Sequence, residues 1–289
     1  MFKNHILPLM SNYRIDKIDI STCQELVNQW SKKLKGFKMV KSYAAKVLTF
    51  AIKRGYIQTN PFDAVEMPIS KKKDFLKKEK EKFYTREQLL ELLECFKEEG
   101  NLKQYAFFHL LAYSGMRKGE AFALTWKDIN FKTREINIYK AVARGEDGLY
   151  IGPVKNDLPR IITMEAKTIE LLQEWRKQQS KEILQLGGNK MTQKHFVFPT
   201  YKNNEIPEPS KTHNWLKKVL DNYNLEPLTA HGFRHTHCSL LFEAGASIKE
   251  VQYRLGHKDV QTTLDVYTHV TKQTKSSTVD KFTNYLING

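Results

Sequence analysis

The sequence predicts a mainly α-helical chain with one small antiparallel β-sheet, an α+β protein of two domains. Apolar residues recur at three- and four-residue spacing over most of the chain, as in helices that bury one side. β-branched residues alternate with polar ones only within residues 131–163. A lysine-rich stretch divides two helical parts, and a chain of 289 residues suits two domains.

Residues 1–68 are expected to form the first, helical domain. Ser21-Thr22 can cap a helix that begins at Cys23, and apolar residues follow at helical spacing, namely Leu26, Trp30 and Leu34. A second helix is predicted over 39–54 and ends at Gly55. Its apolar side is expected to comprise Val40, Tyr43, Ala44, Val47, Phe50 and Ala51.

Residues 69–83 are interpreted as an interdomain linker. They carry seven lysines against three acidic residues, and they lack a sustained apolar side. Repulsion between the lysines favours an extended segment. It can serve as a solvated tether, as a strap along a phosphate backbone, or as both.

Residues 84–289 are expected to form the second domain. Thr85-Arg-Glu-Gln88 has the pattern of a capping box and opens a helix that reaches about residue 97. Gly145, Gly148 and Gly152 mark turns within 131–163, which predicts a three-stranded antiparallel sheet. Further helices are predicted at 102–114, 165–184, 210–223, 232–244, 248–255, 260–267 and 272–286.

The charge balance points to a polyanionic partner. Lysine and arginine outnumber acidic residues by 47 to 32, giving a net charge of +15. Nucleic acid is the commonest such partner of soluble proteins, although charge that serves solubility alone would give the same composition. The three cysteines suit neither a disulfide framework nor a metal cluster, and no signal peptide or membrane span is evident. We therefore expect a cytoplasmic protein.

Two arginines stand in distinctive settings, Ser114-Gly-Met-Arg117-Lys-Gly-Glu120 and His231-Gly-Phe-Arg234-His235. A phosphodiester under attack gathers charge on its non-bridging oxygens. A guanidinium group donates two parallel hydrogen bonds to such oxygens and stays protonated. Because Arg117 and Arg234 are predicted on different helices, they can hold one phosphate from two sides. No comparable set of carboxylates surrounds these motifs, which argues against a two-metal nuclease.

Tyr267 is the candidate nucleophile. A free phenol has a pKa of about 10, so ionising it at neutral pH costs roughly 4 kcal/mol. Neighbouring guanidinium groups and an imidazole proton acceptor, His231 or His257, can recover much of that cost. Lys155, in the turn Gly152-Pro-Val-Lys155-Asn156, is the candidate general acid for the leaving 5′-oxygen, and Lys140 is a weaker one.

Each residue also has a plainer interpretation. Arg117 can be a surface residue that pairs with Glu120 at i+3, and Tyr267 can be a half-buried aromatic anchor. Three histidines could suggest a metal site, but the spacing of His231, His235 and His237 does not place three ligands on one side of a helix. The joint occurrence of these groups favours DNA strand exchange over any of the single alternatives.

Several motifs resemble those of the tyrosine recombinases of the phage integrase type, above all integrases of temperate phages and conjugative transposons. The matching motifs are Tyr113-Ser-Gly-Met-Arg117-Lys-Gly-Glu120-Ala, Leu124-Thr-Trp126-Lys-Asp128-Ile129, His231-Gly-Phe-Arg234-His235-Thr236, Leu255-Gly-His257 and Val266-Tyr267-Thr-His269-Val. The resemblance implies a core-binding domain followed by a catalytic domain. It implies six catalytic residues, Arg117, Lys155, His231, Arg234, His257 and Tyr267, with Glu120 supporting the arginine site.

The resemblance also implies a reaction and its partners. Strands of double-stranded DNA attachment sites would be cleaved and rejoined through a 3′-phosphotyrosyl intermediate, without metal or nucleotide cofactor, to integrate or excise a mobile element. The protein would act as a homotetramer on DNA at the bacterial nucleoid, aided by an excisionase or a DNA-bending protein. A tail helix bearing Val279, Phe282 and Leu286 would pass to a neighbouring subunit or fold back on its own domain.

Two departures from the family pattern concern the Lys155 turn and the N-terminus. The turn reads Lys155-Asn-Asp-Leu-Pro-Arg160, one residue shorter than in many relatives and without their Thr and Ser. The opening Phe2-Lys-Asn-His-Ile-Leu-Pro8 resembles the end of the first core-binding helix, so most of that helix is expected to be absent. Two alternatives remain: a truncated, inactive DNA-binding relic, and a type IB topoisomerase, which the front domain and tail match less well.

Overall fold

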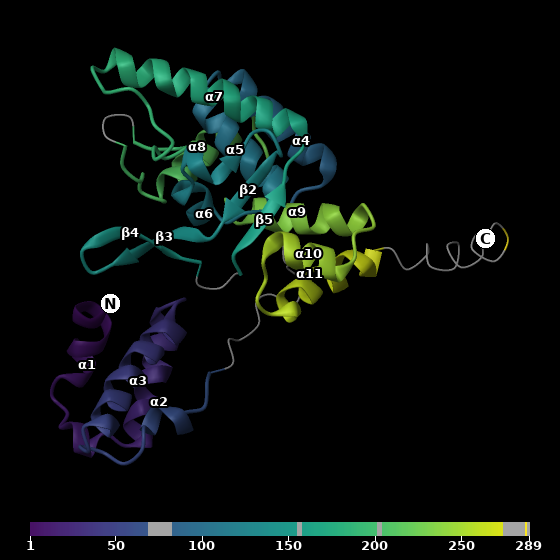
Figure 1. Ribbon diagram of the computed structural model, residues 1–289. Coiled ribbons are helices and arrows are strands. Elements are labelled where there is room, and N and C mark those ends of the chain that lie inside the picture. Colours follow the sequence, from purple (N-terminus) through teal and green to yellow (C-terminus); the bar gives the residue numbers. More distant parts are fainter. Residues whose placement is uncertain (69–82, 155–157, 201–203, 274–286, 288–289) are drawn as a thin grey trace. The chain divides into compact units, whose positions relative to one another are not determined.

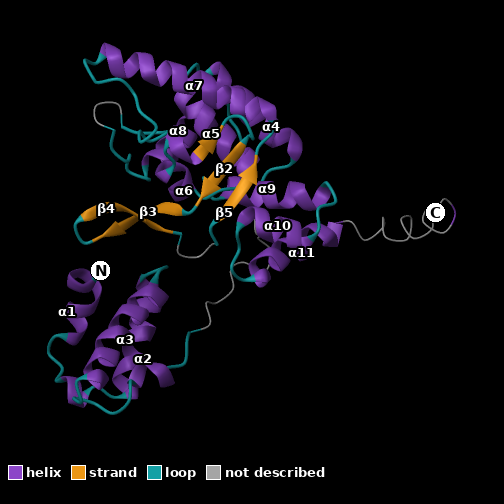
Figure 2. Cartoon of the chain, in the orientation of Figure 1, coloured by secondary structure: helices purple, strands orange, loops and turns teal. Residues whose placement is uncertain are grey.

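The computed structural model describes residues 1–68, 83–154, 158–200, 204–273 and 287, with side chains to residue 268 and at 287 (Figure 1). The chain divides into two compact units, Met1–Lys78 and Glu79–Gly289. Most described elements are helices, and the few strands are antiparallel (Figure 2). The predicted class, mainly α with a small antiparallel sheet, is confirmed. In the described part of the chain, no helix is both long and apolar enough to cross a membrane.

The first unit is built from short and medium helices. A π-helical turn Phe2–Ile6 leads into α1 (Leu7–Met10), α2 covers Ile20–Lys33 and α3 covers Phe37–Lys53. The prediction that Ser21-Thr22 caps α2 is wrong. Asp19 is the cap, because its carboxylate accepts a hydrogen bond of 2.7 Å from the Thr22 amide, and a carboxylate suits the positive end of a helix.

The apolar side of α3 also differs from the prediction. Val40, Ala44 and Ala51 are buried as expected. Three other expected core residues lie on the surface instead, namely Tyr43, Val47 and Phe50, with exposed fractions of 40%, 40% and 56%. The helix has two adjoining apolar faces, and sequence spacing alone cannot tell which of them meets the core of the unit.

The second unit holds the longer helices. The capping box of Thr85 and Gln88 opens α4 as predicted. The helices are α4 (Arg86–Glu98), α5 (Leu102–Ser114), α6 (Lys118–Ala123), α7 (Ala166–Gln185), α8 (Lys211–Asn222), α9 (Gly232–Glu243), α10 (Ile248–Leu255) and α11 (Val260–Gln273). The six-residue α6 was not predicted, and α11 runs past the predicted end at 267. Of the predicted tail helix, residues 274–286 lie outside the described residues.

The strands form two antiparallel sheets. The first has three strands in the order β1 (Ile129–Asn130), β2 (Glu135–Ile138) and β5 (Arg160–Thr163). The single three-stranded sheet predicted within 131–163 is therefore only partly right, because β1 precedes that range and the glycine-rich segment forms a separate sheet. The second is a ribbon of β3 (Lys140–Gly145) and β4 (Gly148–Pro153). The ribbon passes close to α6, because a Cβ atom placed on Gly119 would lie 3.2 Å from the Val142 carbonyl oxygen. A glycine in the Arg117-Lys-Gly-Glu120 motif thus allows strand and helix to meet.

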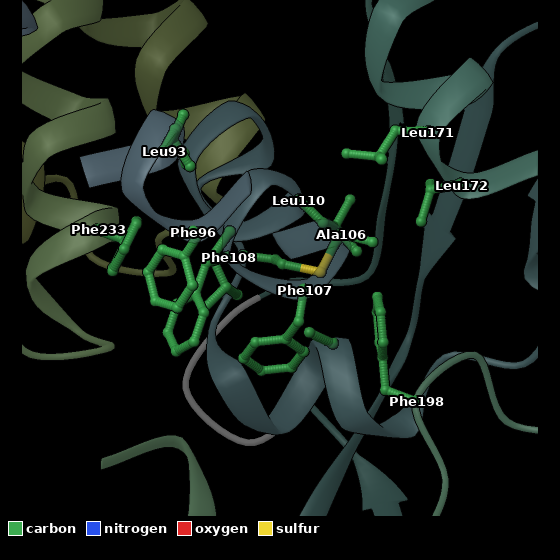
Figure 3. Packing of buried hydrophobic residues seen from close by; sticks show 14 of the residues in the cluster. Leu93, Phe96, Ala106, Phe107, Phe108, Leu110, Leu171, Leu172, Phe198 and Phe233 are labelled. Carbon is green, nitrogen blue, oxygen red and sulfur yellow. The ribbon is translucent and has the colours of Figure 1, made fainter. Parts of the chain in front are cut away.

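An aromatic core holds the second unit together. Phe96 and Phe108 stack with ring centroids 4.4 Å apart, and Phe108 also contacts Phe233 of α9. Figure 3 shows these rings with Phe107 and Phe198 between the helices. Because Phe233 is buried in this cluster and stands next to Arg234, the core fixes the start of α9. Full burial of each such ring stabilises the fold by about 1.5–3 kcal/mol.

Candidate active site

Four of the predicted site residues line one small cavity of about 50 Å³ in the second unit: Arg117, His231, Arg234 and His257. They come from the start of α6, the start of α9 and the segment after α10. The sequence separates these residues by up to 140 positions, from 117 to 257. The wall of the cavity is completed by His235, Cys238, Leu255, Thr262 and Val266.

Arg117 stands just before α6, at its N-cap, rather than within a helix. Gly115 follows the last residue of α5 and caps that helix with a left-handed φ of +65°, and a Cβ atom placed there would lie 2.6 Å from the His237 ring. Both facts favour glycine at this position. The backbone N–H of Arg117 donates to the Glu120 carboxylate at 2.9 Å. The turn that carries Arg117 is therefore held on one side by the close packing at Gly115 and on the other by the hydrogen bond to Glu120.

Arg234 is almost fully buried, with 3% of its surface exposed. Its Nη1 donates to the Gly115 carbonyl oxygen at 3.0 Å and its Nη2 to that of Leu255 at 2.9 Å. Burial and the nearby Arg117 cation lower the pKa of Arg234 to about 9, so the group stays charged at neutral pH. Two cations held close together in a partly buried site favour an anion between them.

His231 and His257 are uncharged at neutral pH. Burial, the neighbouring His235 ring and the Arg117 cation lower the pKa of His231 to about 4. Burial and the two candidate arginines lower the pKa of His257 to about 3. The Nδ1 atom of His257 lies 2.8 Å from the hydroxyl of Thr263. A neutral imidazole can accept or donate one proton, as proton transfer to and from a phosphodiester requires.

Tyr267 does not line the cavity, although its neighbour Val266 does. Its ring packs against Phe242 of α9, with centroids 5.1 Å apart, and 36% of its surface is exposed. The helix α11 thus borders the site with Val266 and presents Tyr267 toward α9. In this structure the phenol is next to the cavity rather than in it.

The candidate general acids have different positions. Lys155 lies outside the described residues, but Pro153 and Val154, just before it, line a larger cavity of about 480 Å³ that also reaches Arg117 and His231. The weaker candidate, Lys140, forms an ion pair of 2.7 Å with Asp128, and its side chain is only 13% exposed. Lys140 lines neither cavity, and its ammonium group is paired with Asp128 instead.

Sequence reasoning missed two arginines that support the site. Arg160 of β5 forms a buried bidentate ion pair with Glu120, with N–O distances of 3.1 and 2.9 Å. Glu120 therefore pairs with Arg160, not simply with Arg117 as the surface interpretation had it. Arg254 donates from Nε to Nε2 of His237 at 3.0 Å, and Nδ1 of His237 lies 2.8 Å from the Ala112 carbonyl oxygen. These contacts explain His237 as a structural residue.

Among the described residues, no three His, Cys, Asp or Glu side chains are grouped to hold a metal ion. His231 and His235 lie together with their rings at 88° and centroids 4.8 Å apart. His237 is turned toward Ala112 and Arg254 instead.

Comparison with known proteins decides the family. The sequence profile of the phage integrase family matches residues 82–274. The chain belongs to the phage integrase family. It is a tyrosine recombinase. It shares 27% identity with a XerC-like tyrosine recombinase of Caldanaerobacter subterraneus, and the matched region covers 99% of this chain and 75% of that protein. It shares 28% identity with the ICEBs1 integrase of Bacillus subtilis over 84% of its length and 63% of that protein.

Solved structures show that the integrase fold extends over most of the chain. A Tn1549 transposon integrase in complex with transposon right end DNA matches 96% of this chain and 91% of that one, with a TM-score of 0.72 at 22% identity. A lambda integrase dimer bound to a core site matches 91% of this chain and 84% of that one, with a TM-score of 0.61 at 17% identity. At such identities the likeness establishes the fold of this integrase, and residue roles have to be argued from its own site.

Proposed function

We propose that this tyrosine recombinase integrates or excises a mobile genetic element by cleaving and rejoining DNA strands through a 3′-phosphotyrosyl intermediate. The observation that carries the proposal is the cavity lined by Arg117, His231, Arg234 and His257, with α11 as its wall. Cations and neutral imidazoles around one small space suit a phosphate oxygen better than a metal ion or an apolar ligand.

In the proposed reaction, the Tyr267 hydroxyl oxygen attacks the phosphorus and its proton passes to a neutral imidazole, for which His231 is the first candidate. The bond from phosphorus to the 5′-oxygen breaks, and Lys155 gives that oxygen a proton. Arg117 and Arg234 hold the non-bridging oxygens, and losing one such donor would cost about 3–4 kcal/mol of transition-state stabilisation. The free 5′-hydroxyl of a partner strand then attacks the phosphotyrosine and releases Tyr267.

The position of Tyr267 beside Phe242 implies a rearrangement before attack. Successive residues of an α-helix point about 100° apart, and it is Val266 that meets the cavity. A local turn or shift of α11 upon DNA binding would bring the phenol to the phosphate held by the arginines. No chemical step is possible without it, so we propose that DNA engagement and nucleophile placement are linked.

The positive charge of the chain supports DNA attachment sites as the substrate. The net charge is +15, and the helix α3 has four lysines and no acidic residue from Phe37 to Lys53. Such surfaces bind phosphates by releasing counterions. The proposal includes a homotetramer on DNA with exchange of the tail after α11, and an excisionase or bending protein as an accessory. The apolar tail residues Val279, Phe282 and Leu286 lie outside the described residues.

A nicked suicide substrate tests the proposal, because its short cleaved fragment diffuses away and traps the covalent complex. Duplex DNA from both flanks of the gene serves as the source of attachment sites. Wild-type protein should give a covalent protein–DNA band, and the Tyr267→Phe variant should bind the DNA without forming one. Binding without any adduct would favour the inactive relic. Relaxation of plasmid that lacks an attachment site would favour a topoisomerase.

A further inference from the structure

We propose that Arg160 is a positioning residue of the recombination reaction, whose guanidinium group holds together the three segments that carry Arg117, Arg234 and His257. The inference rests on the proposed function of the cavity. Arg160 does not line the cavity itself, so it would act through the residues that do.

The first link joins Arg160 to the turn of Arg117. Both Nη atoms of Arg160 donate to the two carboxylate oxygens of Glu120, at 3.1 and 2.9 Å, and the paired side chains are 1% and 2% exposed. The Oε2 atom of Glu120 also accepts the backbone N–H of Arg117 at 2.9 Å. One carboxylate therefore connects β5 to the start of α6.

The second link joins Arg160 to the residue that holds Arg234. Nε of Arg160 donates to the Arg254 carbonyl oxygen at 2.9 Å, and Nη2 of Arg234 donates to the next carbonyl oxygen, that of Leu255, at 2.9 Å. These carbonyls are at the C-terminal end of α10, where backbone oxygens lack helical partners and the helix dipole favours cations. Arg160 and Arg234 thus both donate hydrogen bonds to the C-terminal end of α10.

The third link fixes the approach to His257. A Cβ atom on Gly256 would lie 2.9 Å from Cδ of Arg160 and 2.9 Å from the Leu158 carbonyl oxygen. The Leu158 amide in turn donates to the Gly256 carbonyl oxygen at 2.8 Å. The aliphatic part of Arg160 and the backbone that follows the Lys155 turn are therefore packed against the residue just before His257.

These contacts require the shape of arginine. Its planar group presents donors along two edges at once, whereas a lysine ammonium is a single point charge that cannot reach Glu120 and the end of α10 together. A buried ion pair adds little net stability relative to a well-packed apolar pair. The Arg160–Glu120 pair would contribute by keeping the catalytic side chains in place. Displacing a reacting group by about 1 Å can slow a reaction on the order of 100-fold.

The test compares the buried Arg160–Glu120 pair with a largely buried ion pair of the same unit, Lys140–Asp128. Arg160→Lys and Glu120→Gln disturb the proposed positioning pair. Asp128→Asn disturbs the matched Lys140–Asp128 pair, which is 2.7 Å long with side chains 13% and 3% exposed, and which lines neither cavity. Thermal unfolding first selects a temperature at which all variants are folded. Single-turnover cleavage of the suicide substrate is then measured at saturating DNA, with affinity measured separately.

We expect Arg160→Lys to cleave on the order of 100-fold more slowly at unchanged DNA affinity, Glu120→Gln to be slowed less, and Asp128→Asn to cleave at the wild-type rate. Equal slowing by Asp128→Asn, or wild-type cleavage by Arg160→Lys, would overturn the proposal. If Arg160→Lys does not fold, the test rests on Glu120→Gln, which should cleave more slowly than Asp128→Asn. Equal cleavage rates for these two variants would then overturn the proposal.

A second readout keeps this inference separate from the proposed function. Orthovanadate mimics a phosphate under attack and should raise the unfolding temperature of wild type and Asp128→Asn but not of Arg160→Lys. An equal rise in Arg160→Lys contradicts the positioning role, and so does no rise in wild type. Absence of any wild-type adduct would reject the proposed function, whereas loss of the vanadate effect in Arg160→Lys alone would still support the positioning role.

Discussion

The ring of Tyr267 packs against the ring of Phe242 with the two planes 71° apart, an edge-to-face contact between α11 and α9. The contact is made by the aromatic rings, so phenylalanine at position 267 preserves it. We expect Tyr267→Phe to lower the free energy of unfolding by no more than about 1.5 kcal/mol, the range of a single hydrogen bond, measured by urea unfolding. A much larger loss would mean that the hydroxyl is structural, and that the variant is unsuitable as a catalytic control.

Thr263 is predicted to fix the proton position on His257. Its hydroxyl lies 2.8 Å from Nδ1 of His257 and the side chain is fully buried. A hydrogen bond at one ring nitrogen decides which tautomer a neutral imidazole adopts. Thr263→Val keeps the shape and removes that bond, so cleavage should slow by about 10- to 100-fold, by analogy with the loss of residues that orient metal-binding histidines. Thr263→Ser should restore the rate. Equal rates for valine and serine would refute this role.

Stability should fall in mild acid because of His237. Burial and the Arg254 cation lower its pKa to about 3, from an ordinary value of 6.5. Below about pH 6.5 the unfolded chain binds a proton at this histidine, whereas the folded protein does not bind one until the pH nears 3. The stability that comes from the neutral His237 is therefore complete only above about pH 6.5 and is lost as the pH falls. The unfolding temperature should decline as the pH drops from 6.5 toward 4. His257 and His231 contribute in the same direction.

His237→Gln tests the assignment. The variant is less stable at pH 7, because the contacts to Ala112 and Arg254 change, but its unfolding temperature should vary less between pH 6.5 and 4. The measurement is a series of thermal melts across that range. If the unfolding temperature of His237→Gln falls with pH as steeply as that of wild type, groups other than His237 cause the acid sensitivity.

Gly256 is predicted to be required for close packing as well as for its backbone angle. Its φ is +77°, and a Cβ atom there would meet Arg160 and Leu158 at 2.9 Å. Gly187 has nearly the same φ of +75° with nothing within 4 Å of such an atom. Gly187→Ala should therefore cost only the left-handed conformation, about 1 kcal/mol. Gly256→Ala should cost about 1–3 kcal/mol more, because overpacking adds to it.

Chemical denaturation of the two glycine variants provides the comparison. The difference between them isolates the crowding, since both substitutions place alanine in the same backbone region. Similar losses of stability in both variants would show that the end of α10 yields easily to an extra methyl group.

The sequence predicted most helices of the second unit because their apolar spacing and caps are strong and local, as at Thr85 and Gln88. Short elements escaped prediction. The helix α6 has only six residues, too few to be stable alone, and it depends on the burial of Phe122 and its neighbours. The choice between the two apolar faces of α3 likewise depends on packing partners that sequence spacing does not name.

Arg160 could have been recognised from its strand. Arg160 and Ile162 are two residues apart in β5 and both face the interior, while Ile161 and Thr163 face outward. An arginine on an inward position needs an acidic partner, which points to a buried ion pair. The partner could not be named from sequence, because Glu120 is 40 residues away and reaches Arg160 only through the fold.

The identity of the DNA-linked residue decides whether Tyr267 is the nucleophile. Protein trapped on the suicide substrate is digested with trypsin, and the peptide that retains nucleotides is identified by mass spectrometry. The fragment 259–272 contains Tyr267 as its single tyrosine, and the fragment 250–254 contains Tyr253, which is 66% exposed. We expect nucleotides on fragment 259–272 alone. Nucleotides on the Tyr253 fragment, or on any other peptide, would contradict it.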